Sequence, residues 1–144
     1  MPATHPHPSF HFSVEAGLTR IGFARVQLPC MERDVIRYRE GTDKTDTVRL
    51  LPGLLRLTDC VLERGVTPPD NEFFRWLIAA SLGPTERRDV SVTVLDAKLQ
   101  PSMVWRMRNT FPVALDWSVL DAQSSSVLIE TLRLGVESME VETV

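Results

Sequence analysis

Alternation of apolar and polar residues, with a period of two, dominates this chain and predicts β-strands along most of its length. From Ser9, the apolar residues Phe10, Phe12 and Val14 alternate with polar ones, which is typical of a half-buried strand. A turn at Gly17 precedes a second short strand over 21–26, so we expect the two to form a hairpin. The segment before them, MPATHPHP, contains three prolines, and we expect residues 1–8 to be extended and mobile.

The next part of the chain predicts two strands separated by a polar loop. The strand expected over 31–40 has no face that is apolar throughout, which suggests that it serves an interface or a wet channel. The polar stretch GTDKTDTV over 41–48 predicts a loop. Pro52-Gly53 predicts a turn, and a further strand is expected over 54–64, ending at Gly65.

One segment has a helical period instead. Asp70 is a good N-cap, and Gly83-Pro84 is a typical helix end, so we expect a helix over 71–82. On a helical wheel Trp76 lies at the edge of the apolar stripe. The stripe itself, which we expect to be buried against the strands, consists of Phe73, Phe74, Leu77 and Ile78.

Strands resume after the helix. They are expected at 90–94, at 103–111, where Pro112 should interrupt the pairing, at 113–119 and at 127–141, with a turn over 96–100 and a loop over 121–126. The last strand is apolar on much of both faces. Either a second subunit or the helix would have to cover one of these faces, and periodicity does not decide between them. The residues concerned include Leu128, Ile129, Leu132 and Leu134.

The pattern as a whole predicts a mainly β fold, a barrel or sandwich with one α-helix at about 71–82 packed on it. With 144 residues, no internal repeat and no long linker, the chain is expected to be a single domain. The net charge is −3, which provides no general basic field for nucleic acid. No apolar run reaches the ~18 residues that span a bilayer, and the N-terminus does not resemble a signal peptide, so synthesis in the cytoplasm is expected.

Candidate chemistry is sparse. All three histidines, His5, His7 and His11, lie near the N-terminus, where a proline-rich segment lacks the rigid surroundings that a metal site needs. Without a histidine near Ser124–Ser126, a nucleophilic triad is not expected. We therefore expect no enzyme activity, no metal and no cofactor. Cys30 and Cys60 are expected to be free thiols.

Several short motifs follow one another in a recognisable order. They are Tyr38-Arg39-Glu40-Gly41, Leu51-Pro52-Gly53, Leu62-Glu63-Arg64-Gly65-Val66, Asn71–Trp76, Glu86–Val90, Trp105 with Asn109–Pro112, and Ile129–Leu132. Together they resemble the signature of tail-tube proteins from contractile phage tails and extracellular contractile injection systems. The resemblance runs from about Pro8 to Val141. One departure is Gln27–Cys30, where many relatives have V-S-G-L.

The resemblance implies a structural subunit of an inner tube: a β-barrel with one helix that forms hexameric rings, which stack into a hollow tube for cargo. It also implies a surrounding sheath protein, a baseplate hub and spike, a terminating cap, and a protein or DNA cargo in the lumen. The resemblance further implies a particle that is assembled in the cytoplasm and can be released from the cell. Two alternatives stay open, a tube initiator of the same fold and a small ligand-binding β-barrel.

The predicted loop after Tyr38-Arg39-Glu40 is the candidate functional segment. It is too long for a tight hairpin and too polar for a core, and in the resembled family it reaches from one ring to the next. Charges of both signs on it can fix the rotation of facing rings. A solvated loop without such a role is the alternative. The proposed stacking residues are Gly41, Thr42, Asp43, Lys44, Asp46 and Arg49.

Overall fold

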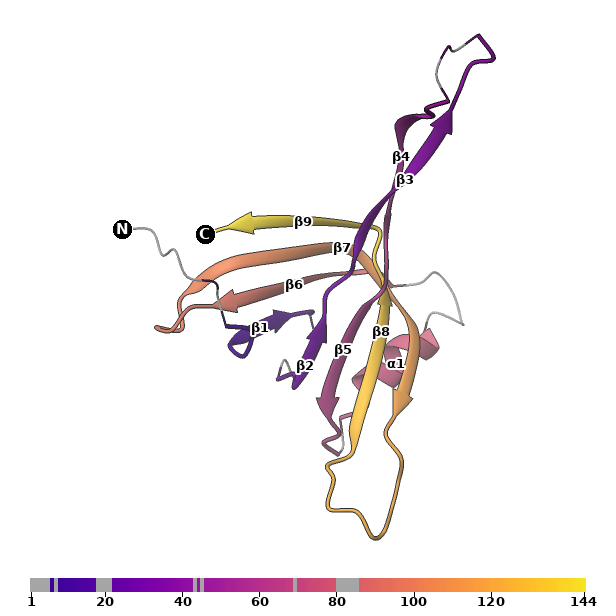
Figure 1. Cartoon of the computed structure of the whole chain (residues 1–144). Coiled ribbons are helices and arrows are strands. Elements are labelled where there is room, and N and C mark those ends of the chain that lie inside the picture. Colours follow the sequence, from indigo (N-terminus) through magenta and orange to yellow (C-terminus); the bar gives the residue numbers. More distant parts are fainter. Residues whose placement is uncertain are drawn as a thin grey trace.

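The computed structural model describes residues 6, 8–17, 22–42, 44, 46–68, 70–79 and 86–144. Its strands and helix follow the chain as β1 (Phe12–Glu15), β2 (Arg25–Gln27), β3 (Met31–Tyr38), β4 (Arg49–Leu57), β5 (Cys60–Gly65), α1 (Glu72–Ala79), β6 (Arg88–Leu95), β7 (Pro101–Trp117), β8 (Ile129–Gly135) and β9 (Ser138–Thr143). The fold is mainly β with one helix in the described residues, as the sequence predicts (Figure 1).

Seven strands form one antiparallel sheet in the order β1-β6-β7-β8-β5-β2, with β9 also paired to β7. The first part of β7 pairs with β6 and β9, and its last part, from Phe111 onward, pairs with β8. Asn109 has a φ of 54°, and the register shifts between Pro112 and Ala114. This bulge turns β7 from one blade of the sheet into the other, and Figure 1 shows the two blades diverging from it.

The hydrophobic core lies where the two blades and α1 meet. Strand β5 places Cys60, Leu62 and Arg64 inside and the intervening residues at the margin. Leu132 and Leu134 on β8 are likewise fully buried, so within the described chain they belong to the core of the subunit itself. Their neighbours Leu128 and Ile129 are half-buried.

The helix presents a different face to the core from the one predicted. Phe73 is fully buried and Leu77 half-buried as expected, but Phe74 is 46% exposed and Ile78 41% exposed. Trp76 is only 2% exposed, and its indole N–H donates to the Glu86 carbonyl oxygen at 2.8 Å. This bond holds Trp76 inside and rotates the apolar stripe away from Phe74. The predicted end of the helix, at 80–82, lies outside the described residues.

Three predictions about strand connections are wrong. The stretches over 9–15 and 21–26 do not form a hairpin, because β1 pairs with β6 and β2 pairs with β5 at the opposite end of the sheet. Pro112 lies within β7 at the bulge instead of interrupting it. The stretch over 127–141 is two strands, β8 and β9. A period of two identifies a strand, but it carries no information about the strand's partner.

The predicted turn at Pro52-Gly53 is also wrong, because both residues lie within β4. Gly53 sits at an irregularity in the β3–β4 ladder, beside Asp34. A Cβ atom on Gly53 would come within 2.9 Å of the Asp34 carbonyl oxygen, so a glycine is required by this close approach. The turn over 96–100 is confirmed, with Asp96 accepting a hydrogen bond from the Gln100 amide at 2.9 Å.

Candidate assembly surfaces

Strands β3 and β4 form a two-stranded sheet of their own that projects from the body (Figure 1). We call residues 31–57 the arm. Most of its side chains are exposed, although two-stranded hairpins are at best marginally stable without packing. The exposed large apolar residues of the arm are Met31, Val35, Ile36, Tyr38, Val48, Leu50, Leu51, Leu54 and Leu55. An apolar surface of this extent marks an interaction site.

The two faces of the arm differ in charge. Cross-strand partners point to the same side of a ladder, so the register places Arg33 with Leu55, Val35 with Pro52 and Arg37 with Leu50 on one face. We call this the Arg37 face. The paired residues of this face are arginines and apolar residues, and none of them is a carboxylate.

The opposite face of the arm carries both signs. Glu32 pairs with Arg56 across the strands, and Arg56 Nη2 lies 2.7 Å from Asp34 Oδ1. Ile36 pairs with Leu51 further along this face. The arm therefore has one basic and apolar face, and one face on which acids and bases already neutralise each other.

The tip of the arm is the predicted ring-stacking loop. It runs over 39–48, so it begins two residues earlier than the polar pattern predicts, and Arg49 belongs to β4. Gly41, Thr42, Lys44 and Asp46 are exposed, and Asp43 lies outside the described residues. Arg39 Nη2 lies 4.0 Å from Asp46 Oδ1, a surface contact that contributes little to stability.

The motif residue Arg64 has a structural role inside the subunit. Arg64 is fully buried, its Nε lies 2.5 Å from Glu130 Oε1, and its guanidinium carbon lies 3.7 Å from the centre of the Phe73 ring. Arg64 Nη2 also lies 3.5 Å from Asp70 Oδ2, and Asp70 accepts from the Glu72 amide at 3.1 Å as the helix N-cap. Arg64 thus ties the start of α1 to β5 and β8.

A second projecting surface, missed by the sequence analysis, lies at the other end of the molecule. The loop between β7 and β8, residues 118–128, extends away from the arm (Figure 1). Its polar centre predicts a loop, but nothing in the pattern shows that Val119, Leu120 and Val127 are exposed. Their position, flanking two predicted strands, makes them look like strand residues.

Strand edges form a further candidate surface. In the part of the chain that the structure describes, β1, β2 and β9 are each paired on one side only. On β9, Glu140 and Glu142 lie 3.3 and 3.2 Å from Arg108 and Arg106 of β7. Free edges of this kind are sites at which another chain can add a strand.

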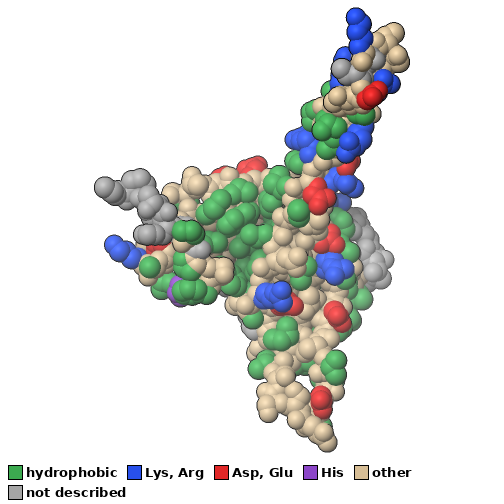
Figure 2. All heavy atoms as spheres, in the orientation of Figure 1, with side chains coloured by type: hydrophobic (Ala, Val, Ile, Leu, Met, Phe, Trp, Pro, Cys, Tyr) green, Lys and Arg blue, Asp and Glu red, His purple; other side chains and the backbone are tan. Residues whose placement is uncertain are grey.

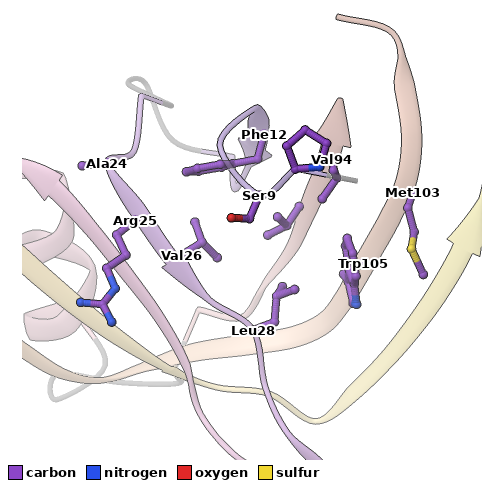
Figure 3. A pocket seen from close by; sticks show the side chains of 11 residues that line it. Ser9, Phe12, Ala24, Arg25, Val26, Leu28, Val94, Met103 and Trp105 are labelled. Atoms are coloured by element: carbon purple, nitrogen blue, oxygen red, sulfur yellow. The ribbon is translucent and has the colours of Figure 1, made fainter. Parts of the chain in front are cut away.

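An apolar hollow of about 450 Å³ lies between the two blades. Phe12, Val94 and Trp105 line it from one side and Val26 and Leu28 from the other (Figure 3). Figure 2 shows the corresponding hydrophobic area on the body beside the arm. A ligand-binding barrel would need an enclosed pocket, whereas this hollow is open to the surface.

The described residues hold little reactive chemistry. No group of three His, Cys, Asp or Glu side chains among them could hold a metal ion, and His5 and His7 lie outside them. Both cysteines are free, Cys30 at the surface and Cys60 in the core, where burial raises the pKa of the Cys60 thiol to about 12. Within the described part of the chain, no helix is long and apolar enough to cross a membrane.

A rigid β body with open strand edges and two projecting apolar surfaces defines a subunit suited to assembly with other chains. The comparisons with known proteins agree. The family of the T4-like virus tail tube protein gp19 matches residues 8–140, and the chain belongs to this family. It is a tail-tube protein of the contractile type. Among curated proteins, none matches this chain in sequence.

Solved structures include similar chains. One, from the sheath–tube complex of the PVC extracellular contractile injection system in its extended state, is 26% identical with a TM-score of 0.88 over 98% of this chain and 94% of that chain. A chain from the PVC sheath/tube terminator is 26% identical with a TM-score of 0.87, covering 99% and 100%. A chain from the six-fold symmetrised baseplate of the anti-feeding prophage shares the fold at 23% identity, with a TM-score of 0.83 over 98% of each.

Proposed function

We propose that copies of this chain form hexameric rings, and that the rings stack into the hollow inner tube of a contractile injection system or phage tail. The observation that carries the proposal is the arm, a two-stranded projection with exposed apolar residues on both faces. Such a surface is stabilised by a partner. The six-fold symmetry of the anti-feeding prophage baseplate, which contains a chain of this fold, supports rings of six.

Ring closure uses the open edges of the sheet. The free edges of β9 and β2 lie on different blades, so one edge of each subunit can meet a different edge of its neighbour. This is a heterologous contact, and a contact of that kind that repeats around a rotation axis closes into a ring. Closure would remove exposed edges that otherwise promote uncontrolled aggregation.

Stacking uses the arm. Its tip, with Gly41, Thr42, Asp43, Lys44 and Asp46 ahead of Arg49, would reach the adjacent ring. Charges of both signs there would set the rotation between rings more than their affinity. The apolar rows behind the tip would supply the contact area.

The subunit's role in this proposal is mechanical, and it performs no catalysis. The sheath would surround the tube, a baseplate hub and spike would start it, and a terminator would close it, in line with the assemblies in which the similar chains occur. Protein or DNA cargo would pass along the lumen. Stiffness would come from the continuous antiparallel ladders of β6, β7 and β8.

Negative-stain electron microscopy of the purified full-length chain, with and without co-expressed baseplate and sheath proteins, tests this function. We expect six-membered rings and hollow rods. Sedimentation that finds only monomers in both settings would contradict the proposal. Quantitative mass spectrometry of whole particles separates the tube from the initiator alternative, because an initiator contributes one ring per particle and a tube protein contributes many.

A further inference from the structure

The loop over 118–128 is held in shape by its own hydrogen bonds. At its base, the Ser118 amide donates to the Ile129 carbonyl oxygen at 2.9 Å, and the Ile129 amide donates to Ser118 Oγ at 3.0 Å. At its far end, the Ser124 amide donates to the Asp121 carbonyl oxygen at 3.2 Å. A loop with internal bonds of this kind presents its side chains in a defined arrangement.

The side chains that this loop presents are apolar. Val119 is 88% exposed, Leu120 82% and Val127 70%. Single exposed apolar residues are common on protein surfaces, but three on one loop with internal hydrogen bonds point to an interaction surface, and we call these three residues the patch. The patch has no cover within the described subunit.

The charged residues of the loop segment itself are all acidic. Between Ala114 and Ile129 the sequence contains Asp116 and Asp121 but no lysine or arginine. The Arg37 face of the arm has the opposite character, apolar residues with arginines and no carboxylate across its paired residues. Two surfaces that are both apolar and of opposite charge are complementary.

The arm and the loop also lie at opposite ends of the molecule (Figure 1). When copies stack head to tail, the end that carries the arm faces the end that carries the loop in the next copy. Because both features project, they would lie side by side across the junction. The same contact then repeats at every junction along the stack.

We propose that the 118–128 loop is the surface that receives the arm of a second copy of this chain in the adjacent ring. Val119 and Leu120 would pack against Val35 and Leu50 of the Arg37 face, with Asp116 and Asp121 close to its arginines. The inference rests on the proposed function and deepens it, since it names the receiving surface on the next ring.

The first test is the double substitution Val119→Asp with Leu120→Asp. Both side chains lie in solvent, so the variant should fold with an unchanged thermal midpoint and still form rings. Carboxylates in place of the apolar contact should shorten the rods at least tenfold by electron microscopy. Leu99→Asp, at a residue that is 58% exposed in the turn between β6 and β7, is the control and should leave rod length unchanged.

The second test uses cysteine pairs in a Cys30→Ser background, because Cys30 is exposed. Leu50→Cys combined with Leu120→Cys should form disulfides between copies under mild oxidation, since a disulfide requires Cα atoms within about 7 Å. Leu51→Cys with Leu120→Cys is the control, because Leu51 lies on the other face of the arm. It should cross-link at least tenfold less.

The outcomes separate the two proposals. Wild-type protein that forms no rods contradicts the proposed function and this contact with it. Normal rods from the Val119→Asp and Leu120→Asp variant contradict the loop contact alone. Cross-links between two Leu120→Cys loops, or stronger cross-links from Leu51→Cys, also contradict it, because they place a different surface against the loop.

Discussion

The arm and the β5–β8 ladder are both antiparallel strand pairs that contain several large apolar residues, yet they bury their side chains very differently. Alternate residues of β5 are fully buried, whereas β3 and β4 expose most of theirs. The difference lies in what packs against each pair of strands. Helix α1 contributes Phe73 and Trp76 to the core beside β5 and β8, and no described element packs on the arm in the same way. What packs on a pair of strands thus decides whether their apolar residues stabilise the subunit or an assembly.

Truncating a residue of α1 that packs on the β5–β8 ladder should have the largest effect on the stability of the subunit. Phe73→Ala removes a fully buried ring that lies over Arg64 and should lower the free energy of unfolding by about 3–5 kcal/mol. Phe74→Ala, next to it but half-exposed, is the matched control, and we expect a loss of less than about 1.5 kcal/mol. Urea unfolding measures both. Equal losses would show that Phe74 is part of the cover after all.

Breaking the buried ion pair between β5 and β8 should have the second-largest effect on stability. Arg64→Ala leaves Glu130, which is 4% exposed, without its guanidinium partner, and should cost about 3 kcal/mol. The double variant Arg64→Met with Glu130→Leu removes both charges and should recover most of that loss in thermal unfolding. If the double variant is no more stable than Arg64→Ala, the pair acts through the Asp70 cap and not through charge burial.

A perturbation within the arm should be smaller and local. Gly53→Ala places a Cβ atom 2.9 Å from the Asp34 carbonyl oxygen, so the β3–β4 ladder must shift. Because the arm makes little contact with the core, we expect a global loss below about 1 kcal/mol. Hydrogen exchange should accelerate in residues 31–38, while the β5 amides stay protected. Faster exchange in β5 would mean that arm and body unfold together.

The sequence predicts where most strands lie better than it predicts how they connect. The turn at Asp96 and the strands around it carry local signals that are independent of tertiary contacts. The pairing of β1 with β6 has no such signal, because alternation is the same for any partner. The helix face depends on the bond between Trp76 and the Glu86 carbonyl oxygen, which forms only when the chain returns after the helix.

The two assembly surfaces also differ in how well the sequence predicts them. The tip of the arm is visible in the sequence, because its polar residues exceed what a tight turn needs. Val119 and Leu120 resemble core residues by composition, and only the fold reveals that they lie in solvent. Apolar residues reserved for a second subunit cannot be told from core residues until the cover of each strand is known.

The smallest expected effect on stability, and the sharpest on assembly, comes from deleting Thr42–Thr47 at the tip of the arm. The deletion leaves Arg39, Glu40, Gly41 and Val48 between the paired residues Tyr38 and Arg49, and four residues are enough to close a hairpin. Because the described residues removed are exposed, the thermal midpoint should stay within about 2 °C of wild type, since surface changes usually fall within ~0.5 kcal/mol. Rings should still form, but long rods should not. Rods of normal length and rigidity would show that the tip does not join the rings, and would leave the apolar rows behind it as the only part of the arm that does.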